Sequence, residues 1–230
     1  MSVLPAALRR LARLQASDKS MGGIFAAAYT GGKRPAAETL TQDGSVLLTV
    51  SEFKQKIDLL ATAIVNVTGY TDRYIGLYGE NSAAWLISFW GILKSGNKPF
   101  LINTLQPVSM MQKALSLVDA AAVLYVGRAP RTEVPLLSYD TLMAGETVPL
   151  PSAPAFADTF AMSTSGSSLE VKVCVYHGAQ IAALLGRTHD HQPVRADKLI
   201  RQPVVDRLQD RRRIRRGQSQ AQGDKRNQNR

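Results

Sequence analysis

Apolar and polar residues follow two different periods between residues 46 and 126. From Val50 to Ile64 the apolar positions recur at steps of three and four residues, which is the spacing of one buried helix face. Farther along, short apolar runs alternate with longer helical patterns, and such runs are typical of buried strands. The runs are residues 74–78, 99–102 and 121–126.

The ends of the predicted helices carry capping signals. Thr49 and Glu52 fit a capping box, in which the hydroxyl accepts from an orphan amide and the carboxylate reaches back to the start of the helix. Asn81 or Ser82 is suited to cap a second helix, and Gly96 is well placed to end it.

A third helix is predicted from Pro107 through Val118. Helices of this length between short apolar strands predict an α/β fold with a mostly parallel sheet covered by helices on both faces. Residues 127–155 are rich in proline and predict a loop-rich connection with one short strand near residues 136–137. Two more strands and a helix are predicted at residues 159–162, 171–176 and 178–185.

The basic charge of the chain is concentrated at one end. A net charge of +10 first suggests a nucleic-acid or anionic-membrane partner. Residues 187–230, however, contain 13 Lys and Arg against five Asp, whereas residues 1–186 contain 15 basic and 13 acidic residues. The basicity therefore belongs to the last segment, and the rest of the chain is an ordinary globular sequence.

Residues 187–230 contain no aromatic residue and few apolar ones, a composition that predicts a disordered tail. Their arginines could bind nucleic-acid phosphates nonspecifically, but no aromatic side chain is present for base stacking, so no specific nucleic-acid partner is predicted. No predicted element holds His189 and His191 as metal ligands. Out-of-frame translation of a GC-rich gene also produces such a composition, and we expect this origin, which would make the chain a truncated one.

The first 20 residues predict an amphipathic helix. Its leucines at helical spacing are Leu4, Leu8 and Leu11. Arg9, Arg10 and Arg13 precede the first acidic residue, so a targeting segment or a membrane-surface helix is an alternative to a helix packed on the domain. No apolar run reaches the length of a transmembrane helix. The single cysteine, Cys174, cannot form an internal disulfide and is expected as a buried, inert strand thiol in a cytoplasmic protein.

The most chemical segment is Thr164-Ser165-Gly166-Ser167-Ser168-Leu169-Glu170-Val171-Lys172, between two predicted strands. Small hydroxyl residues and a glycine allow backbone and side-chain donors to close around phosphate oxygens, and a nearby lysine supplies a compensating charge. The alternative is a polar hairpin turn without a ligand.

Three stretches of the chain resemble the adenylate-forming enzymes, which include acyl-CoA synthetases, luciferases and peptide-synthetase adenylation domains. Residues 48–53, Leu-Thr-Val-Ser-Glu-Phe, resemble the family's Thr-Tyr-x-Glu-Leu helix start. Residues 79–99 resemble its Pro-Asn-Ser … Ala-Ile-Leu-Lys-Ala-Gly-x-x-Pro block, and residues 164–172 resemble its phosphate loop, Thr-Ser-Gly-Thr-Thr-Gly-x-Pro-Lys. The resemblance implies an incomplete N-terminal subdomain over residues 21–186, between the N-terminal helix and the basic tail.

This resemblance implies that ATP, with Mg²⁺, activates a carboxylic acid to an acyl-adenylate, which a thiol of CoA or a carrier protein then accepts. Gly166 would let the backbone approach the phosphates, and Lys172 would be the basic residue of the loop. Hydroxyl and backbone donors would come from Thr164, Ser165, Ser167 and Ser168.

The loop departs from the family pattern in ways that matter for activity. Leu169 stands where the family has glycine, and Gly178 stands where it often has histidine, so His177 receives no role. Nothing in residues 186–230 matches the adenine-binding segment, the magnesium-binding pair, the ribose-binding aspartate or the C-terminal lysine of the family. The chain is therefore expected to be inactive alone, with no assigned catalytic or metal-binding residue. A nucleotide-binding regulatory module, or a subunit completed by a second chain, is the alternative, and a basic nucleic-acid-binding protein is a further, less favoured one.

Overall fold

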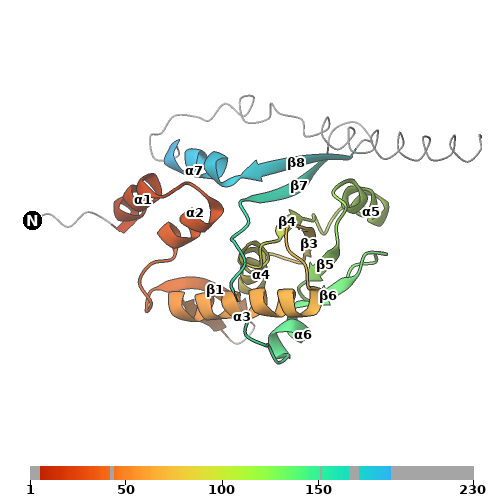
Figure 1. The fold of residues 1–230 in the computed structure, drawn as a ribbon, viewed down its shortest axis with the longest axis horizontal. Coiled ribbons are helices and arrows are strands. Elements are labelled where there is room, and N and C mark those ends of the chain that lie inside the picture. Colours follow the sequence, from red (N-terminus) through yellow and green to blue (C-terminus); the bar gives the residue numbers. More distant parts are fainter. Residues whose placement is uncertain (1–5, 42–43, 151, 166–170, 188–230) are drawn as a thin grey trace, which may run out of the picture. The chain divides into compact units, whose positions relative to one another are not determined.

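A six-stranded sheet in the order β6-β5-β3-β4-β7-β8 organises the chain (Figure 1). The computed structural model describes residues 6–41, 44–150, 152–165 and 171–187, all within the first of two units, residues 1–194. The predicted basic tail and its histidines lie outside the described residues, apart from Arg187. The strands of this sheet are β3 (Tyr74–Tyr78), β4 (Lys98–Leu101), β5 (Ala122–Tyr125), β6 (Leu136–Ser138), β7 (Thr159–Ser165) and β8 (Val171–His177).

The sheet is parallel except at one edge, where β8 pairs antiparallel with β7. This arrangement confirms the predicted α/β fold with a mostly parallel sheet. Helices α3 (Val50–Thr68) and α4 (Ala83–Lys94) pack on the face that carries Ile75 and Leu77. Helix α5 (Val108–Leu117) packs on the opposite face, against Phe100 and Val123. Burial on both faces explains why the central strands are continuous apolar runs.

The predicted helix caps are present. Thr49 accepts a hydrogen bond from the Glu52 amide at 3.3 Å, and the Glu52 carboxylate accepts one from the Thr49 amide at 2.8 Å, which completes the capping box of α3. Ser82, rather than Asn81, caps α4 through the Trp85 amide. Gly96 follows this helix with a φ of +76°, a left-handed conformation that suits glycine.

The N-terminal helix that the leucine spacing predicts is α1 (Ala6–Ala16), and the helix predicted after β8 is α7 (Gly178–Arg187). Four elements were not predicted: α2 (Met21–Ala28), α6 (Tyr139–Ala144) and an antiparallel pair formed by β1 (Pro35–Thr41) and β2 (Gly44–Thr49). Helix α2 is too short and too uniformly apolar to show a period, yet it buries Met21 and Phe25 in the core.

Candidate functional site

The predicted phosphate segment lies between β7 and β8, at the carboxyl end of β7. The strand predicted to end at Met162 continues to Ser165, so Thr164 and Ser165 belong to β7, and Lys172 lies in β8 opposite Thr164. Gly166, Ser167 and Ser168 lie outside the described residues. Because β7 runs parallel to β4, the segment leaves the sheet at the edge where α/β proteins commonly bind ligands.

Lys172 is the basic residue of the predicted phosphate segment. Its side chain is exposed, and it forms no ion pair with the residues that the structure describes. It follows Val171 at the start of β8, so its charge lies at the same end of the hairpin as Thr164. The structure thus brings Thr164, Ser165 and Lys172 together on two paired strands.

Two different apolar contacts hold the hairpin in place. On the α5 face, Ala161 is fully buried, and Val173 and Val175 pack against the same cluster. On the other face, the rings of Phe160 and Tyr176 stack with centroids 5.0 Å apart. Phe160 also contacts Phe89 of α4 edge-on at 5.5 Å.

Cys174 lies on β8 as predicted, but it is half-buried rather than buried. Since β8 is the edge strand of the sheet, its side chains have fewer neighbours than those of the central strands. Burial, together with the neighbouring Cys174, raises the pKa of Tyr176 above its ordinary value. The Tyr176 hydroxyl is therefore neutral at pH 7.

The junction of β8 and α7 leaves no space for a side chain at Gly178, the position at which the resemblance implies a histidine. A Cβ atom at this position would lie 2.5 Å from the Met21 backbone nitrogen and 2.4 Å from Asp158 Oδ1. The same Asp158 oxygen accepts a 2.7 Å hydrogen bond from the Met21 amide at the start of α2. His177 is exposed, and its backbone amide donates to Gln180 Oε1 at 3.0 Å, so the structure gives its imidazole no partner in the site among the described residues.

A second loop lies beside the hairpin, and its contact was not predicted from the sequence. Ser163, the residue before Thr164, donates its hydroxyl to Gln106 Oε1 at 3.2 Å. Gln106 belongs to the turn that follows β4, where its backbone amide donates to the Asn103 carbonyl at 3.2 Å. The two residues are 57 positions apart, and only the parallel pairing of β4 with β7 brings them together.

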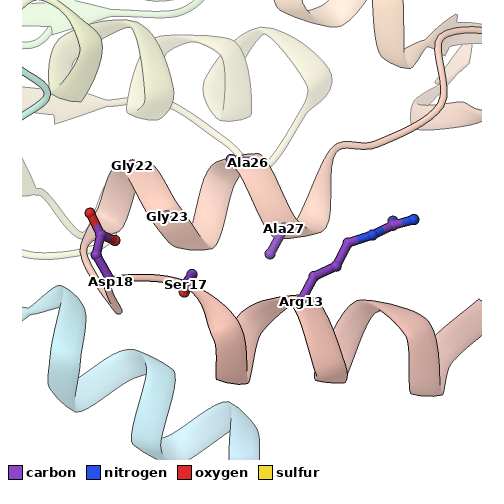
Figure 2. Close-up of a pocket in the computed structure, with 7 residues that line it drawn as sticks. All are labelled: Arg13, Ser17, Asp18, Gly22, Gly23, Ala26 and Ala27. Carbon is purple, nitrogen blue, oxygen red and sulfur yellow. The ribbon is translucent and has the colours of Figure 1, made fainter.

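An open groove lies elsewhere, between α1 and α2 (Figure 2). It has a volume of about 520 Å³ and is lined by Arg13, Ser17, Asp18, Gly22, Gly23, Ala26 and Ala27. Hydrogen bonds from the Ser20 hydroxyl and amide lower the pKa of Asp18, so a carboxylate stands at one end of the groove. The groove shares no residue with the predicted phosphate segment.

Among the described residues, no group of three or more His, Cys, Asp or Glu side chains could hold a metal ion. The helices of the described ranges also include none long and apolar enough to cross a bilayer.

Comparison with known proteins identifies the same family as the three sequence stretches. The model of the AMP-binding enzyme family matches residues 24–199, which begin within α2 and run past α7. No curated protein sequence matches the chain.

Solved structures of adenylation proteins share the fold. The N-terminal subdomain of Klebsiella oxytoca NpsA is 19% identical with a TM-score of 0.60, over 72% of this chain and 43% of that one. An artificially fused adenylation-PCP di-domain from the same organism, NpsA-ThdA, is 19% identical with a TM-score of 0.61, over 72% and 34% of the two chains. The Bacillus subtilis O-succinylbenzoate CoA synthetase MenE, in complex with AMP, is 16% identical with a TM-score of 0.53, over 74% and 41%.

The chain thus spans less than half the length of these structures. Their fold agrees with the mostly parallel sheet described above, and the family match covers most of the 230 residues. On this evidence, the chain belongs to the AMP-binding enzyme family, the adenylate-forming enzymes.

Proposed function

We propose that this chain supplies the ATP-phosphate site of a synthetase that activates a carboxylic acid as an acyl-adenylate. The observation that supports the proposal is the place of the Ser/Thr/Gly segment. Thr164 and Ser165 end β7 and Lys172 is the second residue of β8, at the carboxyl edge of a sheet whose fold is that of adenylation proteins. The Bacillus subtilis synthetase MenE was solved in complex with AMP, and another structure of the NpsA N-terminal subdomain was solved with 3-hydroxybenzoyl-AMSN.

Each residue of the segment has a chemical role in this proposal. The hydroxyls of Thr164 and Ser165, with those of Ser167 and Ser168, donate to phosphate oxygens. Gly166 lets the backbone come close to the phosphates, and the exposed Lys172 ammonium offsets their negative charge as a point charge. Together these groups hold the triphosphate in place while a carboxylate attacks the α-phosphate, and pyrophosphate leaves.

Mg²⁺ accompanies ATP in the family reaction, but the residues described here do not form a site for it. The metal is therefore assigned to no residue of this structure. Stabilising a transferring phosphoryl group requires metal and charged groups positioned together. Since the chain spans 43% of the NpsA subdomain, we propose that these 230 residues alone bind ATP without forming an adenylate.

The first experiment is a calorimetric titration with ATP, which should give a saturable binding isotherm. Lys172→Ala should weaken ATP binding about tenfold or more, because a hydrogen bond to a charged group contributes roughly 1.5–3 kcal/mol. Lys113→Ala is the matched control, because Lys113 is an exposed lysine on α5 and should not change the affinity. Wild-type affinity in the Lys172 variant would contradict the assignment of the segment.

Turnover is tested separately by pyrophosphate exchange into ATP with a panel of carboxylic acids. The proposal predicts no exchange above background for any acid, and exchange with even one acid would refute the inactive state. The acid itself is not assigned.

A subunit completed by a second chain is the second candidate, and the edge position of β8 favours it. An uncovered strand edge is a surface on which another chain can pair. A downstream open reading frame that encodes the remaining half of the domain would support this candidate, and pyrophosphate exchange restored by mixing the two chains would test it. An acceptor thiol, of CoA or a carrier protein, and a cytoplasmic location belong to the same proposal.

We also attribute the basic segment to a change of reading frame. The family match ends at residue 199, and the arginine-rich stretch 211–216 follows it. Translation of the other two frames of the DNA downstream of codon 186 should recover further adenylate-forming sequence. If neither frame encodes any, the attribution is wrong.

A further inference from the structure

The side chain of Gln106 has one satisfied and one unsatisfied end. Its Oε1 accepts a hydrogen bond from the Ser163 hydroxyl at 3.2 Å, whereas its Nε2 is buried and has no hydrogen-bond partner among the residues that the structure describes. A carboxamide nitrogen carries two N–H donors, and buried donors in folded proteins are nearly always paired. The unpaired nitrogen therefore requires an explanation.

The turn that carries Gln106 places a polar side chain inward and an apolar one outward. Leu105 is 91% exposed, while its neighbour Gln106 buries its amide nitrogen. Two backbone hydrogen bonds hold the turn in this arrangement. The backbone amide of Leu105 donates to Asn103 Oδ1 at 2.9 Å, and the backbone amide of Gln106 donates to the Asn103 carbonyl at 3.2 Å. Pro107, with its restricted φ, then leads into α5. Hydrophobic burial would favour the opposite arrangement, so the inward carboxamide points to a polar role.

Gln106 lies at the edge of the sheet from which the phosphate segment leaves. Strand β4 pairs in parallel with β7, with Leu101 opposite Met162, so the turn after β4 meets β7 just beyond that pair. Ser163 contacts Gln106 there, and the next residue is Thr164 of the phosphate segment. The carboxyl edge of a parallel sheet is where α/β proteins commonly bind ligands.

We propose that Gln106 is a phosphate-binding residue whose carboxamide Ser163 holds in one orientation. With Oε1 committed to Ser163, the two N–H groups of Nε2 remain as donors, and a phosphate oxygen of the bound nucleotide accepts from them. A neutral amide suits this role because it donates at every pH without adding a charge that would have to be desolvated. The inference rests on the proposed ATP site and adds to it a residue from outside the family-like segment.

The test compares Gln106→Leu, which removes both polar groups at similar volume, with Gln106→Glu, which keeps an acceptor but replaces the donor by a carboxylate. Gln55→Leu is the matched control, on the exposed side of α3. Titrations use ATP, inorganic tripolyphosphate and adenosine, and thermal unfolding is followed for each variant. The combination separates a contact to phosphate from one to the nucleoside and from a loss of fold.

Gln106→Leu should lower the affinity for both ATP and tripolyphosphate about tenfold, with a melting temperature equal to or above that of the wild type because a buried unpaired donor has been removed. Gln106→Glu should lower the affinity further through charge repulsion, and Gln55→Leu should leave it unchanged. Wild-type affinity in Gln106→Leu, a loss confined to adenosine, or a loss matched by unfolding would overturn the inference and leave the proposed ATP site intact. No ATP binding by the wild-type chain would overturn both.

Discussion

Strands β3 and β8 belong to one sheet but have different surroundings. Ile75 and Leu77 of β3 are fully buried, because the strand lies inside the sheet with helices on both faces. Every described side chain of β8 from Val171 to His177 is at least partly exposed, because the strand lies at the edge. The contrast shows that β3 is enclosed on both sides and both faces, whereas the strand that carries Lys172 pairs with β7 alone and packs only partly buried side chains against the α5-face cluster and Phe160.

The same contrast separates two kinds of role. The central strands hold the turn after β4 in place, because their side chains are packed in apolar clusters on both faces of the sheet. The hairpin of β7 and β8 carries Thr164, Ser165 and Lys172 at the end where the proposed phosphate segment lies. We call the central strands with their helices the body, and β8 the edge. In the proposed function the body provides the stability and the edge binds the ligand, and the following substitutions test that division.

Phe53→Ala should have the largest effect on the free energy of unfolding. Phe53 is fully buried on α3, and its ring lies 4.8 Å from that of Tyr29. Loss of a buried phenylalanine costs about 3–5 kcal/mol, while Val173→Ala on the half-buried edge strand should cost only about 1 kcal/mol. Urea denaturation measures both, and Val67→Ala, at a residue 63% exposed, serves as a control with little change. Equal losses at Phe53 and Val173 would contradict the division between body and edge.

Gly178→Ala tests whether the hairpin is anchored to α2. The added methyl group would meet the Met21 amide and the Asp158 carboxylate at 2.4–2.5 Å, so backbone must shift. We expect a loss of about 1–3 kcal/mol in unfolding free energy, as for other overpacked sites. Gly186→Ala, where no atom of the described residues lies within 4 Å of the added atom, should be neutral or stabilising. A Gly178 variant as stable as the Gly186 variant would show that this junction is not tightly packed.

Thr49→Ala removes the cap at the start of α3. The variant should lose about 1 kcal/mol of unfolding free energy, as is typical of N-caps. Thr49→Ser retains the hydroxyl that accepts from the Glu52 amide and should keep most of the stability. Chemical denaturation of the two variants checks this, and equal losses would show that the methyl group, not the cap, is responsible.

The pH dependence of stability should show the smallest effect, through Glu52. Hydrogen bonds from the Thr49 amide and hydroxyl lower the pKa of the Glu52 carboxyl. A lowered pKa in the folded state means that the carboxylate stabilises the fold at neutral pH. The contribution begins to fall near the unfolded-state value, about pH 4.3, and is lost as pH falls through the lower folded-state pKa. Glu52→Gln should flatten the acid limb of the stability curve, measured by denaturation at stepped pH, and an unchanged limb would exclude this carboxyl as its source.

The sequence predicts the body of the fold well, for a physical reason. Strands buried on both faces appear as unbroken apolar runs, and Thr49 with Glu52 satisfies a local capping rule, so neighbouring residues suffice to identify both. Strands β1 and β2 were missed although Asp43-Gly44 is a hairpin-turn signal, because their apolar pattern is weak. The length of β7 was underestimated because Thr164 and Ser165 owe their strand conformation to pairing with β8.

The candidate site is less accessible to sequence reasoning than the fold. The Ser/Thr/Gly segment is recognisable because its residues are contiguous. Gln106 is not, since its role depends on Ser163, 57 residues away, and on a nitrogen whose burial no local pattern encodes. Residues that act through tertiary contacts emerge only once the parallel strands have been placed side by side.

Amide hydrogen exchange with and without ATP tests the central claim most directly, because it locates the ligand on the chain. We predict that ATP slows exchange at the ends of β7 and β8, around Ser163–Ser165 and Val171–Lys172, and in the turn at Gln106. Exchange in β3 should stay slow in both states, because this strand is already buried. Protection confined to the groove between α1 and α2, or no protection at saturating ATP, would contradict the assignment of the phosphate site to this hairpin.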